Sequence, residues 1–203
     1  MNRTIGLAAS ALLLAACAVT KGPQTEVVMR VEPPVPARAA ASGVGLIAFS
    51  PVTAHGTAAE RRYAYVDSAA PSEVRQAATL FWEEPPPRLV ERALGPGLSA
   101  RLGAQVVAAD QAPGAERRLT VQVDRFEEHA GGAASALVAV NASVTSVNPR
   151  ALLFEKRYCG SAGIPEASPS RRAAAFDAAL SSVMDQVAAD LARPAGTIQP
   201  SSC

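Results

Sequence analysis

The sequence has almost no excess of charge of either sign. Its 203 residues include 19 Lys and Arg against 18 Asp and Glu, for a formal net charge of +1. A protein that binds nucleic acid needs a basic face, and one held on anionic lipid by charge alone needs a basic patch. The near-neutral balance argues against both classes.

Familiar catalytic and metal-binding motifs are also missing. There is no G-x-S-x-G, H-E-x-x-H or Walker A loop, and neither histidine, His55 or His129, is close to a cysteine in the sequence. In the pairs Glu83-Glu84 and Glu127-Glu128, neighbours on a strand would point to opposite faces, so we expect solvated side chains rather than acid/base couples. The sequence therefore predicts no catalytic, cofactor-binding or metal site, and no enzyme.

No run of about 20 apolar residues, the length that a transmembrane helix needs, is present. A shorter apolar run over residues 5–14 follows Arg3 and precedes two alanines, which is typical of a secretory signal peptide. Cys17 comes directly after Leu14-Ala15-Ala16. An ordinary signal peptide with a chance cysteine is the alternative interpretation of this segment.

The segment from Leu14 to Cys17 resembles the lipobox of bacterial lipoproteins. In that class the thiol takes a diacylglycerol and the new amino terminus takes a further acyl chain, such as palmitate. The resemblance implies that residues 1–16 are a removed signal peptide and that Cys17 is the lipid attachment site. Such an anchor is stable, because each buried CH₂ group contributes about 0.8 kcal/mol.

Cysteine is otherwise scarce, since only Cys159 and Cys203 remain. They form an even pair in a compartment that permits disulfides. Their spacing does not dictate pairing, because Cys203 is the last residue and chain ends are often poorly ordered. A Cys159–Cys203 disulfide and two unlinked thiols both stay open.

The chain divides into one domain with two tails. Residues 17–43 show no apolar periodicity and are rich in proline and alanine, so we expect a lipid-anchored spacer there, with a short strand over 26–31 as the alternative. The folded domain is expected over 44–193. A loose tail is expected over 194–203.

Apolar alternation predicts the strands of this domain, at 44–49, 62–66, 78–82, 104–109, 119–126, 138–145 and 152–159. Phe126 breaks the alternation of the fifth strand, which indicates a bulge near Asp124-Arg125. The pair Gly131-Gly132 then predicts a hairpin turn into the next strand.

Two helices complete the expected fold. The first follows the triple proline 85–87, and the sequence Gly95-Pro96-Gly97 predicts a kink or a break into two short helices. The second begins after Ser168, the expected N-cap, and stops before Pro194. Together these elements predict an α+β domain, with a largely antiparallel β-sheet and two helices packed on one face.

Four segments, taken together, point to a known family. They are the strand Arg62-Tyr63-Ala64-Tyr65, the step Phe81-Trp82-Glu83-Glu84-Pro85-Pro86 before the first helix, the strand over 119–127, and the terminal amphipathic helix. The combination resembles the ABC-type transport auxiliary lipoprotein family over roughly residues 44–192. The helix interruption at 95–97 and the connection over 52–60 depart from the family's pattern.

The resemblance implies a non-catalytic lipoprotein in the outer membrane, facing the periplasm. It would dock an Mce-domain protein of an ABC transporter so that lipids can move between the inner and outer membranes, with the ATPase and permease on separate chains. Ala18 fits sorting to the outer membrane, because the usual retention signal is an aspartate at that place. Tyr63, Tyr65 and Trp82 are the candidate partner contacts, and ordinary core packing is the alternative.

Two other functions stay open. A structural or pilot lipoprotein would share the anchor, spacer and domain but would help to assemble another envelope complex. A secreted hydrolase would need a pocket with convergent polar groups. The sequence identifies neither the transported molecule nor the number of copies that associate.

Overall fold

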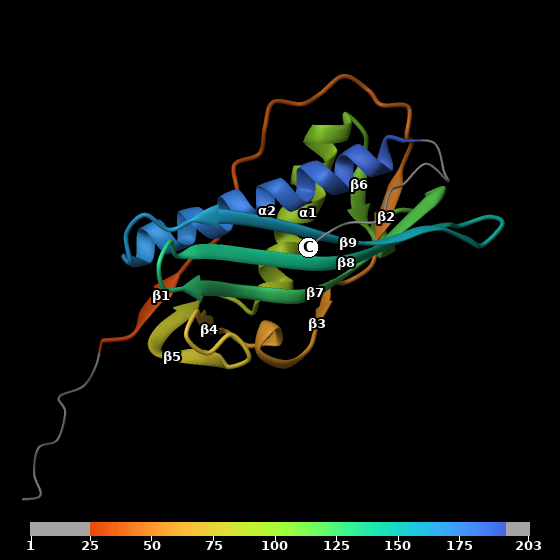
Figure 1. Ribbon diagram of the computed structural model, residues 1–203. Coiled ribbons are helices and arrows are strands. Elements are labelled where there is room, and N and C mark those ends of the chain that lie inside the picture. Colours follow the sequence, from red (N-terminus) through yellow and green to blue (C-terminus); the bar gives the residue numbers. More distant parts are fainter. Residues whose placement is uncertain (1–24, 194–203) are drawn as a thin grey trace, which may run out of the picture.

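Strand β7 (Arg117–Ala130) is the strand around which the sheet is built (Figure 1). The computed structural model describes residues 25–193. On one side, β7 pairs antiparallel with β8 (Ser135–Ser146), which pairs antiparallel with β9 (Ala151–Gly163). On the other side, three strands follow one another along β7 and run parallel to it: β2 (Ile47–Phe49), β3 (Thr53–Ala54) and β4 (Arg62–Asp67).

The remaining strands extend this second side. β5 (Val74–Trp82) pairs antiparallel with β4, β1 (Val27–Met29) pairs parallel with β5, and β6 (Val106–Ala108) pairs parallel with β2. The predicted α+β class is confirmed, and the sheet is mixed rather than purely antiparallel, its long pairings β7–β8 and β8–β9 being antiparallel. Alternation of apolar and polar residues has the same period in both kinds of sheet, so it could not reveal the direction of pairing.

Both helices cover one face of the sheet, as predicted. α1 (Pro86–Leu102) packs against β6, β7 and α2 (Pro169–Leu191), and α2 lies along β8 and β9 (Figure 1). Two short 3₁₀ helices, η1 (Gly56–Ala59) and η2 (Ala109–Gln111), connect strands. The main core lies between these helices and the sheet, and its largest fully buried side chains are Trp82, Tyr63, Tyr158, Phe126 and Phe176.

Helix α1 runs without a break through Pro96, so the expected division into two short helices is wrong. The flanking glycines let α1 approach its neighbours closely. A Cβ added to Gly95 would lie 3.4 Å from the Val106 carbonyl oxygen, and one added to Gly97 would collide with Met184 of α2. This close packing on both sides offsets the roughly 3 kcal/mol that an interior proline costs.

Residues 27–43 differ from the expected spacer. The alternative of a short strand is the one that the structure shows, because β1 extends the sheet and Val31 is buried. Further along, the backbone amides of Ala39 and Ser42 donate to the carbonyls of Ala100 and Leu102. These are terminal carbonyls of α1, which have no partner within the helix. The segment is therefore part of the fold, and the folded region begins near residue 27.

Three local predictions can be compared with the structure. The register of β7 and β8 shifts between Val123 and Arg125, which confirms the bulge. Gly131 and Gly132 form the hairpin turn with φ of 96° and 54°, a region that favours glycine. Ser168 occupies the N-cap of α2, but its hydroxyl makes no capping hydrogen bond, so that part of the prediction is wrong.

Candidate functional site

Tyr63 and Trp82, two of the three predicted contact residues, lie in the core. Trp82 is 0% and Tyr63 1% exposed. The Trp82 ring packs edge-to-face on Phe126 and Phe176, with centroid distances of 5.2 and 4.8 Å, and at a tilt on Tyr63. Core packing, the alternative reading of these aromatics, is therefore correct for both. Tyr65 on β4 is half-buried and remains the only one of the three with exposed surface.

Trp82 instead fixes the place where α1 begins. Its backbone amide donates to the Arg61 carbonyl at 2.7 Å, and Arg61 Nε donates back to the Trp82 carbonyl at 3.1 Å. The next amide, of Glu83, donates to the Met29 carbonyl at 2.8 Å. The step from sheet to helix is thus held to two other chain segments, one before β4 and one at the end of β1.

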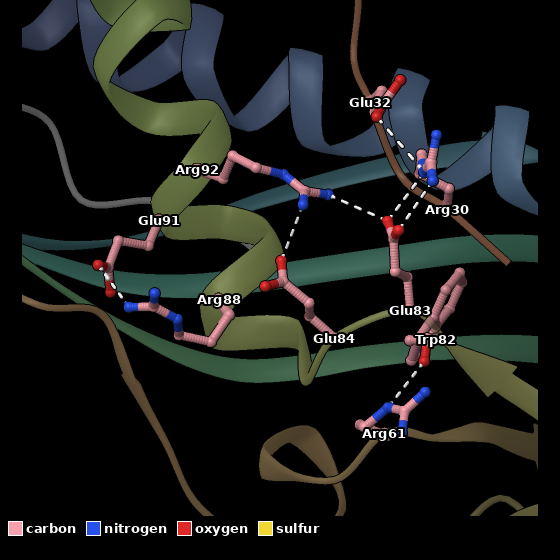
Figure 2. A network of polar contacts seen from close by, with 9 residues as sticks. All are labelled: Arg30, Glu32, Arg61, Trp82, Glu83, Glu84, Arg88, Glu91 and Arg92. Carbon is pink, nitrogen blue, oxygen red and sulfur yellow. Dashed lines mark hydrogen bonds and ion pairs between the residues drawn. The ribbon is translucent and has the colours of Figure 1, made fainter. Parts of the chain in front are cut away.

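On the outer side of this step, five charged residues form a network: Arg30, Glu32, Glu83, Glu84 and Arg92 (Figure 2). Arg30 donates Nε and Nη2 to the two carboxylate oxygens of Glu83, each at 2.8 Å. On α1, Arg92 Nη1 lies 2.9 Å from Glu84 Oε2, and Arg92 Nη2 lies 3.6 Å from Glu83 Oε2. The expectation that Glu83 and Glu84 are simply solvated is therefore wrong, because both form ion pairs, and Glu83 joins α1 to Arg30 beyond β1.

The network changes the pKa of Glu83, the carboxyl at its centre. The hydrogen bond from Arg30 holds the pKa of Glu83 below its ordinary value, with a further contribution from Arg92. A carboxyl with a lowered pKa stabilises the fold above its unfolded pKa and loses that contribution as the pH falls through its folded pKa.

Glu83→Gln should therefore reduce the acid sensitivity of folding. We expect the wild type to lose more stability than Glu83→Gln between about pH 6 and pH 3, measured as midpoints of denaturant unfolding. Glu26→Gln is the control, because Glu26 is exposed and has no ion-pair partner in the described part of the chain. A pH dependence of Glu83→Gln that equals that of the control would contradict the role given to this pair.

An apolar groove adjoins the network. It has a volume of about 240 Å³ and lies between residues 31–35 and α1. Val35 is 56% exposed there, and Arg92 belongs to both the groove and the network. The lining residues are Val31, Glu32, Pro33, Val35, Leu89, Arg92, Ala93 and Pro96. We call this surface the α1 groove; most of its lining is apolar, and its charged residues are Glu32 and Arg92.

Sequence reasoning missed a second set of polar residues, which is buried under α2. Glu128 is 5% exposed, and its Oε2 accepts hydrogen bonds from Tyr63 Oη at 2.5 Å and Arg172 Nε at 2.8 Å. Burial and the adjacent Glu128 raise the pKa of the Tyr63 hydroxyl, so it stays a donor. The expectation that Glu127-Glu128 is a solvated pair is wrong. Glu127, on the opposite face, is also buried and lies 3.3 Å from His129 Nε2.

A similar contact fastens the far end of α2. Asp190, only 3% exposed, accepts hydrogen bonds from Lys156 Nζ at 2.8 Å, Tyr158 Oη at 3.0 Å and Arg193 Nη1 at 2.9 Å. Lys156 and Tyr158 lie on β9, so this contact and the one at Glu128 hold both ends of α2 to the sheet. Both are structural contacts, because every polar group in them is occupied by its neighbours.

The predicted cysteine sites are only partly within the described residues. Cys159 lies on β9, and its carbonyl accepts a hydrogen bond from Gln186 of α2 at 2.7 Å. Cys17 and Cys203 lie outside residues 25–193. Lipid attachment at Cys17 and the Cys159–Cys203 disulfide therefore stay predictions.

Metal sites and membrane spans can be described for residues 25–193 alone. No group of three or more His, Cys, Asp or Glu is placed to hold a metal ion in this region. No helix here has both the length and the apolar character that a membrane span requires.

Comparison with known proteins identifies the family. The family described as the ABC-type transport auxiliary lipoprotein component matches residues 29–192, which is most of the chain. The chain belongs to this family. The match begins at Met29 in β1, in agreement with the early start of the fold. Among curated proteins, none matches this chain.

Solved structures show the same fold at low sequence identity. Protein XCC0632 from Xanthomonas campestris, of the DUF330 family, is 17% identical with a TM-score of 0.69, over 80% of this chain and 92% of that one. A second structure, described as an uncharacterized protein, is 17% identical with a TM-score of 0.61, over 83% of this chain and 97% of that one. At such identity the likeness concerns the fold alone.

Proposed function

We propose that this protein is a non-catalytic auxiliary component of an Mce-type ABC transporter that moves lipids between the inner and outer membranes. It is attached to the outer membrane through acyl chains on Cys17 and faces the periplasm. The observation that carries the proposal is membership of the transport auxiliary lipoprotein family over residues 29–192. The lipobox-like segment before Cys17 supports the anchor.

The α1 groove is the surface that we assign to the Mce-domain partner. Its walls are held in place by the pairs of Arg92 with Glu83 and Glu84, so the groove is formed before a partner arrives. The exposed Val35 offers an apolar contact beside charged residues, a combination that suits a protein interface with an apolar centre and a polar rim.

The length of the tether limits where this partner can be. Only residues 18–26 separate Cys17 from β1, and ten steps of extended chain span about 35 Å at most. The longer spacer that the sequence suggested would have let the domain move further from its membrane. The domain therefore stays close to the outer membrane, and the partner has to supply most of the distance across the periplasm.

Site-specific photo-crosslinking in intact cells tests the proposal. A photoreactive residue at position 35 should yield an adduct with an Mce-domain protein, identified by mass spectrometry. Position 74 is the matched control, because Val74 is also exposed, at 46%, but lies on β5 outside the groove. Adducts only with components of another envelope assembly would favour the pilot function, and equal labelling from both positions would remove the assignment of the groove.

A further inference from the structure

A second cleft lies at the end of the sheet where β8 turns into β9. It has a volume of about 700 Å³ and adjoins a smaller hollow of about 260 Å³, because Arg118, Ser146 and Val147 line both. The larger part is enclosed by β2, the segment 112–118 and the β8–β9 turn. No residue of this cleft lines the α1 groove. The volume is within the range of small-molecule binding sites.

The cleft is hollow because its floor consists of small side chains. Ala48, Ala112 and Ala115 are buried and form an apolar cluster that is separate from the main core. Gly114 adds no side chain at all, and Val147 and Leu153 supply the apolar wall on the β8–β9 side. An apolar group that entered here would contact alanine, valine and leucine side chains, with Ser146 and Asn148 beside them.

The rim of the cleft carries unpaired positive charge. Arg118 and Arg150 are both exposed, and within residues 25–193 neither makes an ion pair or a hydrogen bond. Arg117 also lines the cleft and donates to the Leu191 carbonyl, while Glu116 is the one acidic residue of the lining. Most other arginines within residues 25–193 donate to a carboxylate or a carbonyl. Examples are Arg30, Arg75, Arg88, Arg92, Arg101 and Arg172.

The backbone that carries these arginines is well braced. The Val147 amide donates to the Glu116 carbonyl at 2.9 Å, and the Ala151 amide donates to Ser146 Oγ at 3.1 Å. Arg118 itself belongs to the long strand β7. The two arginines therefore lie on hydrogen-bonded backbone beside the apolar side of the cleft. Val147 and Leu152 are exposed nearby, at 41% and 60%.

We propose that this cleft binds one molecule of an anionic amphiphile. Arg118 and Arg150 hold a phosphate group, for which the guanidinium fork is well matched in geometry and charge. The apolar part of the ligand lies against Ala48, Ala112, Val147 and Leu153. The unpaired arginines argue for the anion, and the alanine floor argues for an attached apolar chain. This inference uses a different surface from the α1 groove and does not depend on the transporter assignment.

Titration calorimetry with three probes tests the ligand class. The probes are lauroyl lysophosphatidylglycerol below its critical micelle concentration, monolaurin and inorganic phosphate, and the protein is the full chain made soluble by Cys17→Ser. We expect saturable one-to-one binding of the lysophospholipid, weaker by at least about tenfold for each of the other two probes, because each lacks one half of the ligand. Equal affinity for phosphate alone would reduce the cleft to a simple anion site and overturn the proposal. Equal affinity for monolaurin, or no saturable binding, would overturn it as well.

Three variants test the residues. Arg118→Gln and Arg150→Gln should each weaken lysophospholipid binding by about tenfold or more, since each removes charged hydrogen bonds to the phosphate. Arg171→Gln should leave it unchanged, because Arg171 is also exposed and has no partner in the part of the chain that the structure describes, but lies in the first turn of α2, outside the cleft. Neither cleft arginine has a partner among the described residues, so both variants should keep the wild-type unfolding midpoint. A loss of binding in Arg171→Gln that equals the loss in the other two would overturn the assignment.

Discussion

Replacing Arg172 with methionine should destabilise the domain by about 3–5 kcal/mol, the cost of leaving one partner of a buried ion pair uncompensated. Glu128 would keep its hydrogen bond from Tyr63 but lose the only positive partner that it has among residues 25–193, in a place where its side chain is 6% exposed. Methionine preserves most of the side-chain volume, so the loss reports on the charge rather than on a cavity. Denaturant unfolding followed by circular dichroism measures it.

Two further variants show whether this explanation is correct. Arg171→Met changes the neighbouring arginine, which is exposed and has no partner in the described region, and should shift stability by less than about 0.5 kcal/mol. Adding Glu128→Gln to Arg172→Met should restore much of the lost stability, because the amide is neutral and can still accept from Tyr63. Equal effects of the two arginine variants would show that Glu128 does not need Arg172.

The burial of Glu128 could have been predicted from the sequence, but only by using the bulge. Leu119, Val121 and Val123 face the helices, and a regular strand would then send Glu128 to the opposite face. The bulge between Val123 and Arg125 shifts the alternation by one residue, so Phe126 and Glu128 face the helices instead. The sequence indicated the bulge correctly, whereas treating the glutamate pair as solvated ignored its consequence for the residues that follow.

Other features depend on contacts between segments that are far apart in the chain. Arg30 and Glu83 are 53 residues apart, and no local pattern in either segment indicates that they meet. β1 has only three residues, and its place beside β5 follows from a backbone ladder that any apolar sequence could form. The α1 groove also depends on residues 31–35, which form one of its walls. The proline content of this segment suggested a solvated spacer instead. The class of fold, the two helices and the β7–β8 hairpin were predictable because each has a strong local period.

The tryptophan step shows how a family motif can be read wrongly. Its aromatic residues suggested a contact surface, since aromatics are favoured at interfaces. In the structure Trp82 belongs to the core, and the charged residues after it reach the surface and hold the α1 groove in shape. The motif therefore has a positioning role: it fixes the start of α1 relative to β1 and β4. Partner contact is assigned to the groove beside it.

Cys17→Ser should release the protein from the membrane completely, the largest effect expected of any single substitution here. No other cysteine lies near the expected new amino terminus, so no other residue can take the acyl chains. The domain itself should stay folded, because the elements from β1 to α2 that build its sheet, helices and core lie within residues 27–191. Membrane fractionation and mass spectrometry of the mature amino terminus measure the outcome. A soluble, unmodified wild-type protein that starts at another residue would end the lipoprotein interpretation.

Ala18→Asp tests sorting between the two membranes separately from lipid attachment. The cysteine is kept, so the variant should remain lipid-anchored, but an aspartate after the acylated cysteine is the usual signal for retention in the inner membrane. We expect it to move from the outer-membrane to the inner-membrane fraction with its acyl chains intact. Because the tether of residues 18–26 spans only about 35 Å, the domain would then be held at the wrong membrane and should lose a partner that it reaches only from the outer one. Unchanged fractionation of Ala18→Asp would contradict the proposed sorting, and unchanged crosslinking from position 35 in a relocated protein would show that the partner is reached from either membrane.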